Sequence, residues 1–164
     1  MRLPNLSNKL SAFTLIEVLI VVGIMGVLTV AALPSFGDFA DRRTFQNNVD
    51  IFAENIRSAR NKALDGVVVL GRDVNWQIIP TNNSATYVVK YLFVDSLGGS
   101  GTSQTLKLSG SESKFTCTSC TLEFQRLTGK RISGTLGSSQ NIVISFNGES
   151  KTIKVYETGK MVIE

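Results

Sequence analysis

Two features of the sequence combine residue types and a spacing that could carry chemistry. Glu17 is the one charged residue in an apolar run of 21 residues, 13–33. A charged side chain at mid-bilayer costs about 2.5–3.5 kcal/mol on insertion scales, so such a residue usually has a partner. Cys117 and Cys120 form the second feature, a single Cys-x-x-Cys pair.

The cysteine pair is best interpreted as a local disulfide. A structural zinc site needs four ligands, and the chain has two cysteines and no histidine. A thioredoxin-like redox motif would stand near a βαβ pattern, whereas Cys117 follows a strand-like stretch rich in serine and threonine. Two free thiols in a reducing compartment are the alternative, and no metal is expected.

The sequence gives little support for an enzyme. It has no GxSxG, no P-loop and no dinucleotide fingerprint after a strand, and the lack of histidine removes the commonest general base. Its 17 basic residues stand against 13 acidic ones, a balance that says little about nucleic acid. We therefore expect a non-enzymatic chain without a cofactor.

The apolar run around Glu17 has the length of a membrane span. As a helix it reaches roughly 30 Å, about one hydrocarbon thickness. The preceding residues carry Arg2 and Lys9 and no acid, which favours a cytoplasmic N-terminus and places the rest of the chain outside. On hydropathy alone, an ordinary N-terminal signal anchor is the alternative.

A second helical pattern follows Pro34. Its apolar residues recur at steps of three and four, which predicts one buried stripe: Phe45, Val49, Phe52, Ile56, Ala59 and Ala63. Gly66 can supply a left-handed cap at the end of this helix. Together the two runs predict one helix of about fifty residues, with a bend at Pro34 or Gly37. Two helices joined there are the alternative.

Beyond Gly66 the apolar pattern changes to a period of two, which is typical of strands. Gly98, Gly99, Ser100 and Gly101 indicate a flexible loop, and Asn147-Gly148 gives a type I′ hairpin signal. The sequence thus predicts an α+β fold in which a long helix precedes two small antiparallel sheets. The expected strands are residues 67–70, 74–79, 86–94, 105–108, 114–116, 122–124, 142–146, 151–156 and 161–163.

The N-terminal residues resemble the class III signal of type IV prepilins and pseudopilins. A secretory signal has its apolar core before a small-residue cleavage site, but here small Ala12 precedes the core. Ala12 is followed by Phe13, Thr14, Leu15, Ile16 and Glu17, which matches the family motif. The resemblance implies cleavage between Ala12 and Phe13 by a prepilin peptidase/methyltransferase, and N-methylation of Phe13. Alanine replaces the family's usual glycine, and because alanine is also small we expect processing to occur, at a lower rate.

The C-terminal third is similar in pattern to the head of the FimT/GspH group of minor pilins and pseudopilins. The similar segments are 122–124, 142–144, 152–155 and 159–162, together with 58–63 at the helix end. This resemblance implies a β-rich head at or near the tip of a short periplasmic filament, of a type II secretion system or a type IV pilus. The chain would be a structural, single-pass protein of the inner membrane.

The resemblance also implies how the chain is organised and assembled. Residues 1–12 would be a removed leader, 13–33 a transmembrane and filament-core helix, 34–65 an amphipathic stalk and 66–164 the periplasmic head. In pilins the new α-amine pairs with the matching acid, commonly between neighbouring subunits. We therefore expect Glu17 to set subunit register among other pilins; a role in processing only is the alternative.

DNA uptake is a further alternative, because FimT-like pilins in some bacteria bind DNA through a basic tail after a glycine. Here Gly159 is followed by one cation and the chain ends at acidic Glu164. Lysines on exposed strand edges also serve to prevent edge pairing, and a membrane-anchored β-domain without a filament role is another possibility. The candidates for weak DNA contacts are Lys130, Arg131, Lys151, Lys154 and Lys160.

Overall fold

The computed structural model describes residues 13–134 and 137–164. For residues 31–36 and 38 it describes the backbone alone. The predicted leader, including Ala12, lies outside the described residues. The chain divides into two compact units, Met1–Ala40 and Asp41–Glu164. We call the second the head unit.

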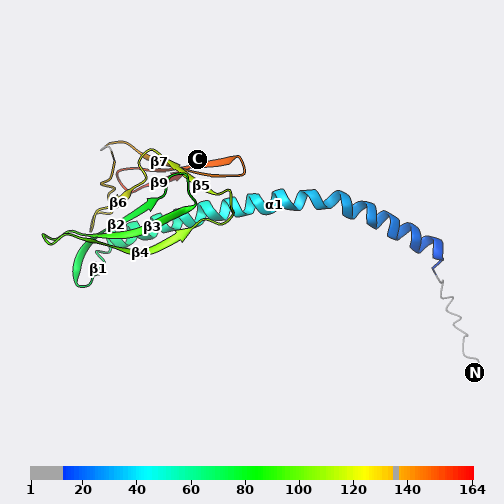
Figure 1. Cartoon of the computed structure of the whole chain (residues 1–164), viewed down its shortest axis with the longest axis horizontal. Helices are drawn as coiled ribbons and strands as arrows, with labels where there is room; N and C mark the ends of the chain where they lie inside the picture. Colours follow the sequence, from blue (N-terminus) through cyan, green and yellow to red (C-terminus); the bar gives the residue numbers. More distant parts are fainter. Residues whose placement is uncertain (1–12, 135–136) are drawn as a thin grey trace, which may run out of the picture. The chain divides into compact units, whose positions relative to one another are not determined.

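One helix, α1 (Leu15–Leu64), precedes all the strands (Figure 1). Its backbone is helical through Pro34 and Gly37, so the alternative of two separate helices is wrong; the bend at these residues stays a prediction. At its end the Val67 amide donates to the Lys62 carbonyl, and the Gly66 amide to the Ala63 carbonyl. Gly66 has a positive φ of 63°, so the helix ends in the expected glycine cap.

The rest of the head unit contains two antiparallel sheets. In the first, the order is β1-β2-β3-β4, and β6 also pairs with β2; in the second, it is β5-β7-β8-β9. Asn147 and Gly148 both have positive φ and join β7 to β8, as the hairpin signal predicted. The strands are β1 (Val68–Val69), β2 (Arg72–Pro80), β3 (Thr86–Phe93), β4 (Ser100–Lys107), β5 (Lys114–Cys117), β6 (Leu122–Phe124), β7 (Gln140–Phe146), β8 (Glu149–Val155) and β9 (Met161–Ile163).

The sequence prediction was wrong about β4. Residues 98–101 were expected to form a loop and only 105–108 a strand, whereas β4 begins at Ser100 and pairs with β3 along its length. The strand lies at the end of its sheet order and is mostly exposed. Backbone hydrogen bonds to β3 hold β4 in the sheet. Its side chains are mostly polar and do not alternate with apolar ones, so the sequence pattern gave no strand signal there.

The predicted stripe on α1 forms the centre of the head-unit core, because all six of its residues are buried. Phe52 has no exposed surface. Its ring lies 5.0 Å from that of Tyr87 on β3 and 4.8 Å from that of Phe115 on β5. These two rings also contact each other at 5.7 Å, so one aromatic cluster joins the helix to both sheets.

Asn48 lies outside the predicted apolar stripe, and yet it is buried at 1% exposure. Its side-chain amide donates to the Ser109 carbonyl and to Ser113 Oγ, and its carbonyl oxygen accepts from the Ser109 amide. These three bonds replace hydrogen bonds to water, so the side chain is buried with its polar atoms still hydrogen-bonded. Asn48 thereby fixes the loop between β4 and β5 to the helix.

Replacing Phe52 by alanine should lower the free energy of unfolding of the head unit by about 3–5 kcal/mol, because it removes a fully buried ring from the aromatic cluster. Ile51→Ala is the matched control, since Ile51 is the adjacent apolar residue and is 45% exposed. Urea titrations followed by near-ultraviolet circular dichroism measure both. Equal losses in the two variants would contradict the central position of Phe52.

Candidate functional site

Thr14 and Glu17 begin α1 as the first half of a capping box. The Glu17 amide donates to Thr14 Oγ1 at 3.3 Å and to the Thr14 carbonyl at 3.1 Å. Thr-x-x-Glu is the spacing at which an N-cap hydroxyl satisfies the third helical amide. The sequence analysis missed this role of Thr14, although the spacing was visible. The motif residues thus start the helix in addition to forming the expected signal.

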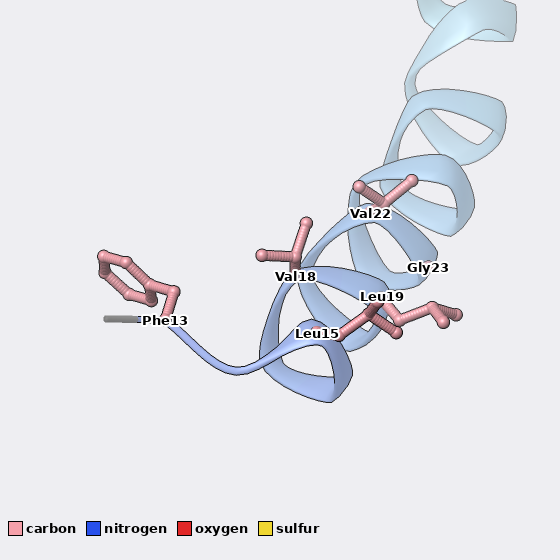
Figure 2. Close-up of a pocket in the computed structure, with 6 residues that line it drawn as sticks. All are labelled: Phe13, Leu15, Val18, Leu19, Val22 and Gly23. Carbon is pink, nitrogen blue, oxygen red and sulfur yellow. The ribbon is translucent and has the colours of Figure 1, made fainter. Parts of the chain in front are cut away.

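The first turns of α1 expose apolar side chains in every direction. Figure 2 shows Phe13 on the residues before the helix and Val18, Leu19 and Val22 along its first turns, around an open hollow. The same exposure continues to Val30. A helix that is apolar all round is stable in water only if something covers it. The exposed large apolar residues are Phe13, Leu15, Ile16, Val18, Leu19, Ile20, Val21, Val22, Ile24, Met25, Val27, Leu28 and Val30.

Glu17 stands exposed on this apolar surface. Within residues 13–134 and 137–164, its carboxylate forms no ion pair and no side-chain hydrogen bond. Among the same residues, no helix has a stretch that is both long and apolar enough to cross a membrane.

The comparisons with known proteins agree with this N-terminal arrangement. The model of the prokaryotic N-terminal methylation motif matches residues 8–33. A solved structure with a similar fold is that of the type IV minor pilin FimU of Pseudomonas aeruginosa. The similarity covers 73% of this chain and 91% of that one, with a TM-score of 0.50 and 14% identity. No curated protein matches the chain.

The chain thus carries a prokaryotic N-terminal methylation motif and shares the fold of that minor pilin. The methylation motif locates its signal, and the shared fold is that of a helix followed by antiparallel sheets. Ala12, the residue before the expected cleavage site, lies outside the described residues, while Phe13 and Glu17 lie within them.

The five cations predicted for DNA contacts lie in different environments. Arg131 is buried at 2% exposure, so it is not available for the DNA contact proposed for it. Lys154 pairs with Glu164 at 2.6 Å, and Lys151 donates to Gln46 on α1 at 3.0 Å. Lys130 and Lys160 remain exposed.

A different basic cluster lies where α1 meets the turn before β9. Arg57, Arg60 and Lys160 line a hollow of about 240 Å³. The Nε of Arg60 is buried without an acceptor, and its side chain lies so close to Gly159 that a Cβ there would collide with it. Arg57 pairs loosely with Glu54 at 3.4 Å. The sequence analysis missed the two arginines because they lie about a hundred residues from Lys160.

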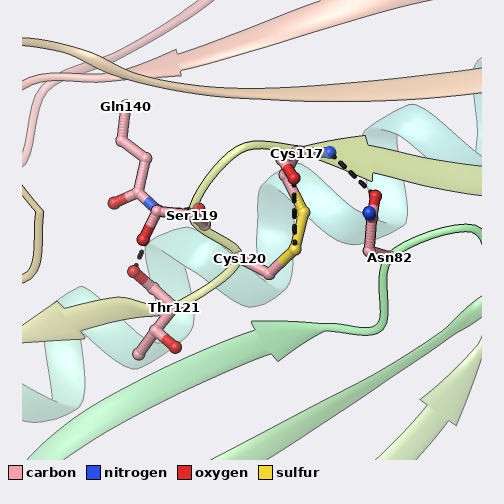
Figure 3. The surroundings of a disulfide bond; sticks show 6 residues. All are labelled: Asn82, Cys117, Ser119, Cys120, Thr121 and Gln140. Carbon is pink, nitrogen blue, oxygen red and sulfur yellow. Dashed lines mark hydrogen bonds between the residues drawn. A yellow bond between two sulfur atoms is a disulfide. The ribbon is translucent and has the colours of Figure 1, made fainter.

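Cys117 and Cys120 are joined by a disulfide (Figure 3). The Cys117 amide donates to Asn82 Oδ1 at 3.2 Å. On the other side, Gln140 Nε2 donates to the carbonyls of Ser119 and Thr121. The bonded loop is therefore held by the segment after β2 and by the first residue of β7. Within the described residues, no group of His, Cys, Asp and Glu side chains could hold a metal ion.

Replacing both cysteines by serine should lower the free energy of unfolding by at most about 2 kcal/mol, because the disulfide closes a loop of sequence separation 3 and so constrains the unfolded chain little. Urea titrations with and without a reductant measure the effect. The reductant should weaken the wild type and leave the Cys117→Ser/Cys120→Ser variant unchanged. A loss several times larger would show that the disulfide does more than close this loop.

Proposed function

We propose that the chain is a minor pilin or pseudopilin, a structural, non-enzymatic subunit at or near the tip of a short periplasmic filament. The observation that carries this proposal is the methylation motif followed directly by a helix that exposes apolar residues on all sides and a Glu17 without a side-chain partner in the described residues. Such a surface needs an apolar covering. The lipid bilayer supplies it before assembly, and the helices of other subunits supply it afterwards.

The motif also suggests how assembly proceeds. Cleavage between Ala12 and Phe13 by a prepilin peptidase creates a new α-amine, which is then methylated, four positions before Glu17. A carboxylate surrounded by apolar side chains gains strongly from a nearby cation. Pairing of Glu17 with the amine of a neighbouring subunit would therefore favour one register along the filament.

The proposed location follows from the sequence around this helix. The apolar run of residues 13–33 anchors the chain as a single pass in the inner membrane, and the basic leader keeps the N-terminus in the cytoplasm. The head unit then lies in the periplasm, where a disulfide such as Cys117–Cys120 persists. A type II secretion system and a type IV pilus both use a subunit of this design.

The test replaces Glu17 by glutamine, which keeps the size of the side chain and removes its charge. We expect the variant to be processed but to lose most of its co-purification with the other pilins of its host. Met25→Leu is the matched control, since it changes an exposed apolar residue of the same helix and keeps the charge. Co-assembly is scored on sheared filaments or on cross-linked membranes.

Mass spectrometry of the mature N-terminus separates processing from assembly. The wild type and both variants should begin at a methylated Phe13. An intact Met1 in the wild type would overturn the filament proposal. A Glu17→Gln chain that is processed and incorporated like the wild type would overturn the role of Glu17 alone.

DNA binding is a second candidate function, favoured by the cluster of Arg57, Arg60 and Lys160. Within the described residues, Arg60 and Lys160 make no side-chain hydrogen bond or ion pair, so both charges are available. Phosphate groups bind clustered cations of this kind without reading sequence.

If this second candidate is right, the full-length protein in detergent should retard duplex DNA at low salt. The Arg60→Gln/Lys160→Gln variant should bind more weakly, with a salt slope lower by about 2. Lys114→Gln is the control, since Lys114 is an exposed lysine on β5, away from this cluster. An absence of retardation by the wild type at low salt would remove the candidate.

A further inference from the structure

A polar hollow of about 260 Å³ lies beside the disulfide loop. One wall is the loop itself, through Thr118 and Ser119, and the opposite wall is the chain that leads into β7. The residues on which the inference depends are Thr118, Ser119, Arg131, Gly134, Ser139 and Asn141. Arg131 is the one charged residue among those that line it, and in the described part of the chain no carboxylate lines it.

Arg131 is a buried cation that forms no ion pair within residues 13–134 and 137–164. Its Nη1 donates to the Ser133 carbonyl and to Gln140 Oε1, and its Nη2 donates to the Ser138 carbonyl at 2.5 Å. These acceptors are neutral, and Nε is buried without an acceptor among the residues that the structure describes. A buried charge is stabilised poorly by neutral groups alone. The guanidinium thus retains an unbalanced charge and an unused donor.

Glu157 is the acid that influences Arg131, but it does not neutralise it. Burial lowers the pKa of the Arg131 guanidinium, and the charge of Glu157 opposes this effect. The two form no ion pair within the described residues, and Glu157 Oε2 accepts instead from the Gly137 amide at 2.9 Å. Among the described residues, Arg131 is therefore the one charged side chain that lines the hollow, and Glu157 offsets part of its charge without forming an ion pair with it.

We propose that this hollow binds a carboxylate group, with Arg131 as the buried cation and the hydroxyl-bearing disulfide loop as the opposite wall. One positive charge balances a monoanion, which favours a carboxylate over a doubly charged phosphate. Hydroxyl and amide side chains at Thr118, Ser119, Ser139 and Asn141 supply the donors that carboxylate oxygens accept from. Gly134 contributes by its missing side chain, since a Cβ there would press on Arg131 Nη1.

The lining residues of the site all belong to the head unit, and the site does not depend on the filament role. The disulfide positions Thr118 and Ser119, and Gln140 bonds both to this loop and to Arg131. The carboxylate could belong to an acidic side chain of another protein or to a small metabolite. Both sources share the same chemistry, and the experiment distinguishes them.

The experiment measures thermal unfolding of the full-length protein in detergent micelles. It compares the unfolding midpoint in sodium acetate with that in sodium chloride at equal ionic strength. Acetate should raise the unfolding midpoint saturably, and chloride should not. Glutamate blocked at both its α-groups is titrated in parallel. A tighter response to blocked glutamate assigns the site to an acidic side chain, and a tighter response to acetate assigns it to a small free carboxylate.

Three variants locate the effect. Arg131→Met removes the cation and should abolish the response to acetate. Ser119→Asp places a carboxylate at the hollow, so it should raise the midpoint without acetate and reduce the response. Ser111→Asp adds the same charge at an exposed turn outside the hollow and should respond like the wild type.

Several outcomes would overturn the proposal. They are a wild type that responds equally to acetate and chloride, a stronger response to phosphate than to acetate, and equal acetate responses in Ser119→Asp and Ser111→Asp. The comparison of the two aspartate variants does not require Arg131→Met to fold, so it decides the matter even if that variant is unstable.

Discussion

The contact of Phe52 with Tyr87 and Phe115 is the interaction on which the head unit depends. The two sheets are small, and each presents one apolar face that must be covered. A helix with a single stripe can cover both only if one of its side chains reaches the line where they meet. Phe52 occupies that position, fully buried, with ring distances of 4.8–5.0 Å to the two sheets. The remaining stripe residues extend this contact along the helix.

The two parts of the same helix differ in how their apolar side chains are distributed. From Leu15 to Val30 its large apolar side chains are exposed in every direction, whereas from Phe45 onward most of them lie in one buried stripe, with Ile51 and Leu64 as exposed exceptions. The chain's own sheets cover the apolar stripe of the second part. Nothing in the described residues covers the apolar surface of the first part, so it requires a bilayer or other helices. Glu17, which has no side-chain partner among the described residues, also determines where along this apolar surface a partner binds, because a charge there favours a partner that supplies a cation.

Periodicity allowed much of the fold to be predicted from the sequence. The steps of three and four from Phe45 to Ala63 gave the buried stripe, and Asn147-Gly148 gave the β7–β8 turn, because in both cases the signal is local. The motif from Phe13 to Glu17 was likewise a contiguous signal, and the methylation-motif match covers it. Where residues close together in the sequence decide the structure, the pattern of side-chain types is a usable signal.

The errors arose where the deciding partner is distant in sequence or is the backbone itself. Asn48 is buried because of Ser109 and Ser113, at separations of 61 and 65 residues. β4 forms through backbone bonds to β3, to which its polar side chains give no clue. The apolar pattern therefore left Asn48 out of the buried stripe and the first residues of β4 out of the predicted strands.

Arg131 shows the same limit and its consequence for function. A Lys-Arg pair in a polar segment is typical of an exposed patch, yet Arg131 pairs in a bridge with Phe124, whose side chain is fully buried. That bridge carries the arginine into the interior, where its charge is no longer screened by water. An exposed cation attracts any anion weakly. A cation buried beside a hollow is selective, because only an anion that fits the hollow can approach it. Backbone pairing thus converts an unspecific charge into a candidate recognition site.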